Sequence, residues 1–133
     1  MTLSNASKCP CGSNLKYIKC CGQYIKLRKD ALTAEALMRS RYTAYVLNDE
    51  AYLLYSWHHS TRPEALDLYD DEVDWKQLRI VSTRLGKQQD KSGEVEFIAD
   101  YLVHRTRLKI HELSQFVKEN NRWFYLNGEI KTE

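Results

Sequence analysis

The hydrophobic period of the sequence changes once, near residue 73, and this change limits the folds that the chain can adopt. Between about residues 33 and 57 the apolar residues recur at helical spacing. From Val73 onward apolar and polar residues alternate, as in strands with one buried face. Helices followed by consecutive strands indicate an α+β domain, with helices packed on one face of a curved antiparallel sheet.

The strongest predicted helix spans roughly residues 33–47. Thr33 is a suitable N-cap, and Glu35 lies in the first turn, where a carboxylate interacts favourably with the helix dipole. The apolar stripe of this helix contains Ala34, Leu37, Met38, Tyr42, Tyr45 and Val46. A second, shorter helix is expected to start after Asn48 and Asp49 and to end near Trp57.

The segments after the second helix read as one turn of helix and then a meander. Thr61, Pro63 and Glu64 predict a capping box or a short helical turn. The later expected segments are a strand over 73–85, a turn over 88–93, strands over 95–103 and 107–118, a turn over 119–121, and a last strand over 123–130. Strands joined by such short turns are antiparallel neighbours.

All four cysteines lie within the stretch CPCGSNLKYIKCCG, at Cys9, Cys11, Cys20 and Cys21. The first residues, MTLSNASK, do not resemble a signal peptide, and no apolar run is long enough for a membrane helix, so we expect a cytoplasmic protein without membrane insertion. Cytosolic thiols are kept reduced, and four clustered thiolates suit one structural Zn²⁺ ion. Free or redox-active thiols are the alternative, although a redox pair is more usually C-x-x-C.

The cysteine stretch resembles the SEC-C motif, a short zinc-binding element that is known from the tail of the SecA translocation ATPase. The motif C-x-C-x-S, a spacer and then C-C or C-H is matched by Cys9, Cys11, Ser13, Cys20 and Cys21. Asn14 stands where the motif commonly has glycine. The resemblance implies that residues 1–29 form a zinc-binding module that contacts partners.

Longer sequence segments resemble the YchJ family of small bacterial proteins. These segments are AEALMRSRYTAYVLNDEAYLLYSWHHSTRP, VEFIADY and HELSQFVKENNRWFYLNGE. The resemblance implies that residues 30–133 form a cone-shaped nuclear-transport-factor-2-like (NTF2-like) domain, related to the cystatin-like folds. The chain departs from the family in two places: it has no second SEC-C motif after the last strand, and it has His59 where the family usually has proline.

Arg41 is the first candidate residue for pocket chemistry. On a helical wheel it lies inside the apolar stripe of the 33–47 helix. An unpaired buried charge is costly, so we expect Arg41 to pair with a sheet carboxylate such as Asp100 or Glu112, or to bind an anion in the open end of the cone.

Trp57 and His58 form the second candidate site. The histidine could act as an acid or base near neutral pH, or the tryptophan could simply be packed between capping polar groups. The predicted strands carry further ionisable residues, Asp100, His104, His111 and Glu112. A His/Asp pair on neighbouring strands could abstract a proton, whereas solvated strand faces explain these residues equally well.

Two functions are therefore open. The first is a non-enzymatic, zinc-containing adaptor, monomeric or homodimeric, that binds a protein or a small molecule. The second is a pocket enzyme of isomerase, dehydratase or hydrolase type. The net charge of +2 is too small to indicate nucleic-acid binding. Contact with RNA or the ribosome would depend on the modest basic cluster Lys8, Lys16, Lys19, Arg28 and Lys29.

Overall fold

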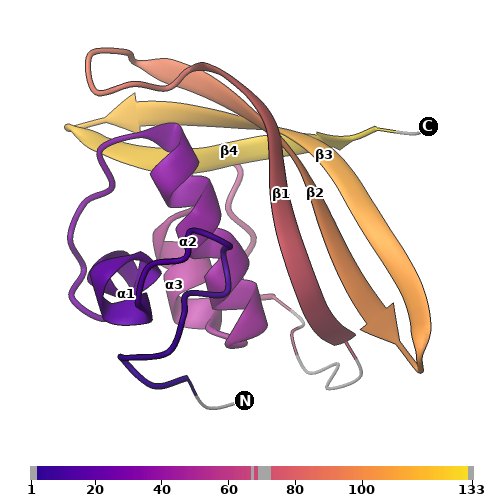
Figure 1. The fold of residues 1–133 in the computed structure, drawn as a ribbon. Coiled ribbons are helices and arrows are strands. Elements are labelled where there is room, and N and C mark those ends of the chain that lie inside the picture. Colours follow the sequence, from indigo (N-terminus) through magenta and orange to yellow (C-terminus); the bar gives the residue numbers. More distant parts are fainter. Residues whose placement is uncertain (1–2, 67, 69–72, 132–133) are drawn as a thin grey trace.

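In the described part of the chain, a curved four-stranded sheet packs over three helices, which one 3₁₀ turn precedes (Figure 1). This computed structural model describes residues 3–66, 68 and 73–131. The elements, in chain order, are η1 (Tyr17–Lys19), α1 (Cys21–Ile25), α2 (Ala34–Val46), α3 (Glu50–Tyr55), β1 (Val73–Leu85), β2 (Ser92–Val103), β3 (Thr106–Glu119) and β4 (Arg122–Ile130). The expected α+β order, with the helices on one face of an antiparallel sheet, is confirmed.

Both predicted helices begin at side-chain caps. The Thr33 hydroxyl accepts a hydrogen bond from the Ala36 N–H at 3.1 Å and starts α2. The Asp49 carboxylate accepts from the Tyr52 N–H at 3.0 Å and starts α3. Each cap satisfies a backbone donor that the first helical turn leaves unpaired.

The helical turn predicted around Thr61, Pro63 and Glu64 is wrong. Residues 61–66 form a turn and then irregular backbone. The Thr61 hydroxyl does not cap a helix, because it donates to the Leu126 carbonyl at 2.6 Å and accepts from the Trp57 indole N–H at 3.1 Å. Thr61 thus attaches the segment after α3 to β4.

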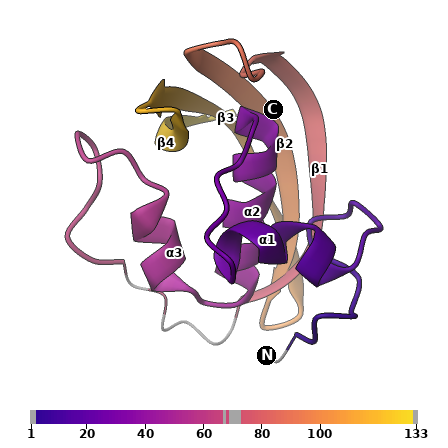
Figure 2. The same cartoon turned by 90° about the vertical axis from the view of Figure 1, so that its left-hand side faces the viewer.

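The sheet is a meander in the order β1-β2-β3-β4, with every pair antiparallel. Two-residue turns join β2 to β3 and β3 to β4, and both residues of each turn have positive φ, as hairpin turns of this length require. The predicted alternation is confirmed on β2, where Val95, Phe97 and Ala99 are buried. These side chains face α2, which lies along the concave side of the sheet in both views (Figures 1 and 2).

The cysteine-bearing segment packs against α2 and reaches the edge strand β1 (Figure 2), where a Cβ placed on Gly12 would lie 3.6 Å from the Leu78 carbonyl oxygen. Cys11, Tyr17 and Cys21 are at most 2% exposed and belong to the same apolar core as Leu37 on α2. The segment therefore shares its core with the main domain. Within the described residues, none of the helices is both long and apolar enough to cross a membrane.

Candidate metal centre and inner cavity

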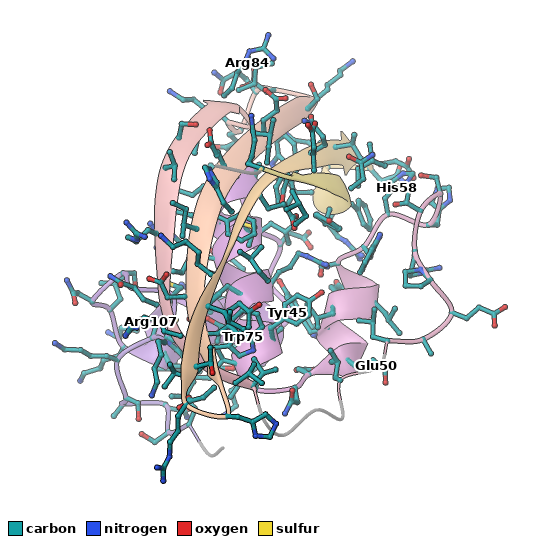
Figure 3. All side chains as sticks on the ribbon, turned by 90° about the vertical axis from the view of Figure 1, so that its right-hand side faces the viewer. Tyr45, Glu50, His58, Trp75, Arg84 and Arg107 are labelled. Carbon is teal, nitrogen blue, oxygen red and sulfur yellow. The ribbon has the colours of Figure 1, made fainter. Side chains whose placement is uncertain are left out.

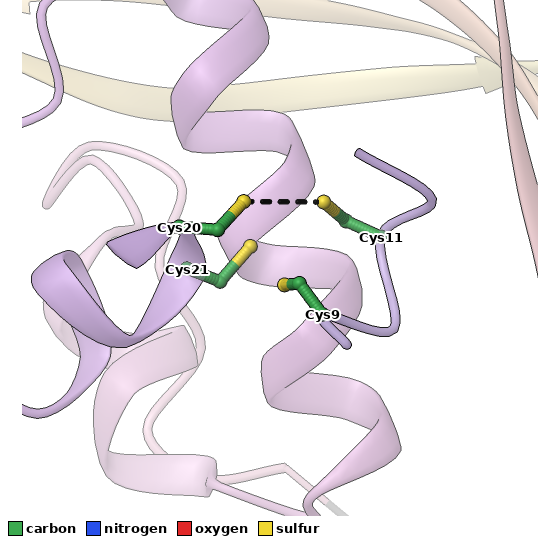
Figure 4. A group of neighbouring side chains, drawn as sticks. All are labelled: Cys9, Cys11, Cys20 and Cys21. Carbon is green, nitrogen blue, oxygen red and sulfur yellow. Dashed lines mark hydrogen bonds between the residues drawn. The ribbon is translucent and has the colours of Figure 1, made fainter. Parts of the chain in front are cut away.

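The four cysteine side chains converge on one point (Figure 4). Their sulfur atoms all lie within 4.8 Å of one another, and the Cys11 and Cys20 sulfurs are 3.6 Å apart. Four sulfurs at about 2.3 Å from a tetrahedral zinc ion would lie about 3.8 Å from one another. The set therefore fits a closed tetrahedral thiolate site, which is a structural type of site.

Short turns bring the cysteines together. Gly12 and Asn14 have φ values of 87° and 68°, in the left-handed region that glycine and asparagine tolerate best. The Cys9 N–H donates to the Leu15 carbonyl at 2.8 Å and closes the loop, while Cys20 and Cys21 lie at the start of α1. The asparagine that departs from the motif's glycine therefore keeps the backbone conformation that this loop needs.

Hydrogen bonds within the cluster divide its protons unequally among the sulfurs. Hydrogen bonds from the Cys21 thiol and the Ser13 hydroxyl favour the Cys20 thiolate and lower its pKa to about 6. A hydrogen bond to Cys11 raises the pKa of Cys9 to about 11. Zinc requires four thiolates, so metal uptake by this cluster would displace the remaining protons.

Two residues of α2 hold the cluster in place. The Arg39 guanidinium donates to the Cys11 carbonyl at 2.8 Å, and the Thr43 hydroxyl lies 3.7 Å from the Cys9 sulfur. Neither residue stands out in the sequence, because each is more than 25 positions from its partner. The four lysines near the cysteines, Lys8, Lys16, Lys19 and Lys26, are all exposed.

A cavity of about 320 Å³ lies on the other side of α2, against the inner face of the sheet. It is lined by Met38, Arg41, Tyr42, Tyr45, Trp75, Phe97, Ala99, Ile110, Glu112, Ser114 and Tyr125. Tyr45 and Trp75, whose rings lie 6.1 Å apart, mark this interior in Figure 3. Most of the lining is apolar and aromatic, which is the usual character of a small-molecule pocket.

Arg41 lies at the wall of this cavity and is only 3% exposed. Its Nη1 donates to the Leu53 carbonyl at 2.8 Å and to the Ser56 hydroxyl at 2.7 Å. Its guanidinium also lies over the Tyr125 ring at 4.3 Å and the Trp57 ring at 5.0 Å. Burial lowers the pKa of Arg41 from its usual value.

The ion pair expected between Arg41 and a sheet carboxylate does not form among the described residues. Glu112 lines the cavity, but its Oε2 accepts from Ser114 at 2.8 Å and from Tyr125 at 3.4 Å. Asp100 does not line the cavity, and lies 3.9 Å from Arg79 on the neighbouring strand β1. Backbone and hydroxyl oxygens and two aromatic rings take the place of that carboxylate.

Trp57 and His58 lie outside the cavity. Trp57 packs edge-on against Tyr125 at 5.0 Å, which gives it the packed role that the sequence left open. His58 lies in a different part of the molecule from Tyr45 and Trp75 (Figure 3), and its Nε2 is 2.9 Å from the Glu119 carboxylate. His58 and Asp100 therefore do not meet around a common cavity.

Of the two histidines predicted on strands, His104 lies instead in the turn between β2 and β3, and His111 lies on the outer face of the sheet. Its Nε2 is 2.6 Å from Glu96, and this hydrogen bond lowers the pKa of the Glu96 carboxyl. On β3 the neighbouring Glu112 points to the opposite, inner face. Side chains alternate between the two faces of β3, so His111 and Glu112 lie on opposite faces although they are neighbours in the sequence.

Comparison with known families and curated proteins identifies similar chains. Residues 33–128 match the family model described as the middle NTF2-like domain of YchJ. A UPF0225 protein of Chromobacterium violaceum is 46% identical over 123 residues, which cover 90% of each chain. A UPF0225 protein of Streptomyces coelicolor is 44% identical over 122 residues, covering 92% of this chain and 94% of the relative.

Two solved structures are similar over nearly the whole chain. The solution structure of a SEC-C motif containing protein from Rhodopseudomonas palustris has a TM-score of 0.82 and 33% identity, covering 95% of this chain and all of that one. The crystal structure of a SEC-C motif containing protein from Psychrobacter arcticus has a TM-score of 0.75 and 28% identity, covering 97% of this chain and 85% of that one.

Proposed function

Because this chain belongs to the YchJ family, with a SEC-C cysteine cluster before its NTF2-like domain, we propose that it is a zinc-containing, non-enzymatic adaptor. The gathering of four sulfurs within 4.8 Å carries the proposal. Four thiolates saturate a tetrahedral ion and leave no position for water, so the metal would act structurally. A cytoplasmic location and a monomeric or homodimeric state belong to the same proposal.

A protein is the partner that the surface of the cysteine module favours. Its lysines are exposed, and two leucines beside them, Leu15 and Leu27, are 53% and 55% exposed. An acidic segment that also carries apolar side chains would match both features. Arg28 fits a separate RNA surface less well, because its guanidinium lies 4.8 Å over the Tyr55 ring.

A metal assay is the first test. Purified protein should contain about one equivalent of zinc, and Cys20→Ser should lose it.

Partners captured from a bacterial extract with and without chelator should then be purified and their affinity measured. Lys16→Glu with Lys19→Glu should weaken that affinity, whereas Lys87→Glu with Lys91→Glu, an equal charge change on the exposed β1–β2 turn, should not. Equal effects of the two pairs would contradict the proposal, and a steep salt dependence of RNA binding would favour RNA instead.

Small-molecule binding in the cavity is the second candidate function. The observation that favours it is Arg41, a buried cation at the cavity wall with no carboxylate within 4.0 Å among the described residues. A ligand with an apolar body and one anionic group would fit such a wall. An enzyme with a His58/Asp100 acid–base pair is less well supported, since neither residue lines the cavity.

An aromatic sulfonate dye can test the cavity. We expect its fluorescence to rise on binding to wild-type protein. The rise should be smaller with Ala99→Leu, whose larger side chain fills part of the cavity, and with Arg41→Met, which removes the cation. Leu113→Met on the outer strand face is the control. Unchanged dye binding in both cavity variants would place the dye elsewhere and contradict this candidate.

A further inference from the structure

A second group of metal-binding side chains lies between the segment after α3 and the end of β3. His58 Nε2 is 2.9 Å from Glu119 Oε2, and His59 Nε2 is 3.4 Å from Glu119 Oε1. The three ligand atoms all lie within 4.8 Å of one another. This group contains no cysteine and shares no residue with the cavity.

His58 is held in a fixed position before any ligand arrives. Its backbone N–H donates to the Tyr125 carbonyl at 2.8 Å, and its ring packs edge-on against Phe124 at 5.7 Å. The side chain is 11% exposed, and its Nε2 faces the Glu119 carboxylate. One ligand of the group is therefore held in place, whereas the His59 ring, which stacks on His58 at 4.2 Å with an angle of 30° between the rings, must turn for its Nε2 to bind the same metal.

The surroundings of His58 also suit metal ligation. A ligating histidine usually donates its second ring N–H to an oxygen, which fixes the tautomer. In the structure the Ser60 backbone N–H donates to His58 Nδ1 at 3.2 Å, so the ring proton lies on Nε2 and is donated to the Glu119 carboxylate. A metal bound at Nε2 would displace this proton to Nδ1, where the Ser60 hydroxyl, 2.7 Å away, can accept it.

The ligand set indicates the kind of metal. Two imidazole nitrogens and one carboxylate bind zinc, nickel or copper in preference to magnesium or calcium. Metal–ligand bonds of about 2.0–2.2 Å place tetrahedral ligand atoms about 3.3–3.6 Å apart. The His59–Glu119 distance of 3.4 Å lies in this range, and the His58–Glu119 distance of 2.9 Å would lengthen on metal binding. Three protein ligands leave at least one position open for water or another ligand.

We propose that His58, His59 and Glu119 form a second, exchangeable site for a divalent transition metal. The His59 and Glu119 side chains are 65% and 47% exposed, so metal exchange at this site is faster than at the buried cysteines. Arg122, the cross-strand neighbour of Glu119, reduces the affinity for a cation, although its guanidinium is turned to the Tyr55 carbonyl at 2.7 Å. The bound metal links the segment after α3 to the β3–β4 turn.

Cobalt titration of the full-length protein, with its cysteine cluster already loaded with zinc, tests the site. Wild-type protein should bind one further equivalent of Co²⁺, with weak ligand-field bands and without the intense thiolate charge-transfer absorption. His59→Gln and Glu119→Gln should each weaken this second binding by more than about tenfold. Both positions are largely exposed, so these variants should remain folded.

His104→Asn is the matched control, because it removes another exposed histidine and asparagine tolerates the φ of 50° at that position. It should bind the second equivalent as the wild type does. The proposal is overturned if the wild type binds no second equivalent, if His59→Gln and Glu119→Gln bind it unchanged, or if His104→Asn weakens binding as much as they do.

Discussion

The cysteine module and the sheet are ordered by different kinds of contact. Within residues 3–26 the regular structure is one 3₁₀ turn, one five-residue helix and an isolated bridge between Lys8 and Lys16. The sheet instead has continuous hydrogen-bonded ladders between successive strands and a large aromatic core. Such short helical segments are marginally stable by themselves, and the four sulfurs can add stability by binding metal.

The two regions meet at α2, which offers one side to each. Arg39 and Thr43 contact the cysteine module, whereas Arg41 and Tyr45 face the cavity under the sheet. Loss of metal should therefore disorder the cysteine module on one side of α2 and leave the sheet on the other side intact. Four measurements test whether the two regions are stabilised separately.

The largest expected effect follows removal of the metal. With Cys20→Ser or a chelator, the cysteine module should lose the metal-binding free energy, on the order of 10 kcal/mol for structural zinc sites. Amide hydrogen exchange should accelerate over residues 9–25, and Tyr17, now 2% exposed, should become accessible. Amides of β2 and β3 should stay protected. Simultaneous loss of protection in the sheet would show that the two regions do not unfold separately.

Trp123→Ala should destabilise the sheet and leave the cysteine module intact. Trp123 is 1% exposed and donates to the Leu32 carbonyl at 3.3 Å, so its truncation should cost about 3–5 kcal/mol of unfolding free energy. Denaturant unfolding of the sheet measures the cost, while zinc content at low denaturant should stay at one equivalent. Val117→Ala, on the outer face of the neighbouring strand β3, should cost much less. Loss of zinc in Trp123→Ala would mean that the cysteine module depends on the sheet core.

Arg39→Ala tests the link between the regions. Arg39 donates both to the Cys11 carbonyl at 2.8 Å and to Glu35 at 2.9 Å. We expect Arg39→Ala to lower the unfolding free energy by about 1–2 kcal/mol, because it leaves a carbonyl without its charged donor. Glu35→Gln removes only the exposed ion pair and should cost less than about 0.5 kcal/mol. Equal costs would mean that the Cys11 contact contributes nothing.

The smallest effect concerns pH and lies on the outer face of the sheet. The hydrogen bond from His111 holds the pKa of the Glu96 carboxyl below its usual 4.5. Its contribution to stability is therefore present above about pH 4.5 and is lost as the pH falls through the lowered pKa. NMR titration should find this pKa raised toward 4.5 in His111→Gln. The same shift should appear with and without zinc. A Glu96 pKa that depends on zinc would show that the cysteine module and the sheet are coupled.

Local signals in the sequence predicted most of the fold. Thr33 and Asp49 cap helices within three residues of their partners, and the alternation of β2 places Phe97 and Ala99 inward. The cysteine cluster was predictable for the same reason, since its four ligands lie within thirteen positions and need only tight turns to meet.

Contacts between distant residues could not be predicted in this way. Glu119 meets His58 across 61 positions, and Arg39 reaches Cys11 across 28. The partners of Arg41 depend on the angle between α2 and α3, which a helical wheel does not contain. The wheel placed Arg41 correctly in the interior, but a carboxylate was the wrong partner, because carbonyl and hydroxyl oxygens at the end of α3 are nearer.

The two outer strands of the sheet also limit how the molecule can aggregate. An open strand edge can pair with another chain and extend the sheet from molecule to molecule. Along β1 the register shifts twice, between Trp75 and Gln77 and between Ile80 and Ser82, so this edge offers only short regular stretches. On β4, Tyr125 exchanges backbone hydrogen bonds of 2.8 Å with Ser56 and His58, and this short parallel segment covers the edge at that point. Both features reduce the length of edge that is open for pairing with another chain.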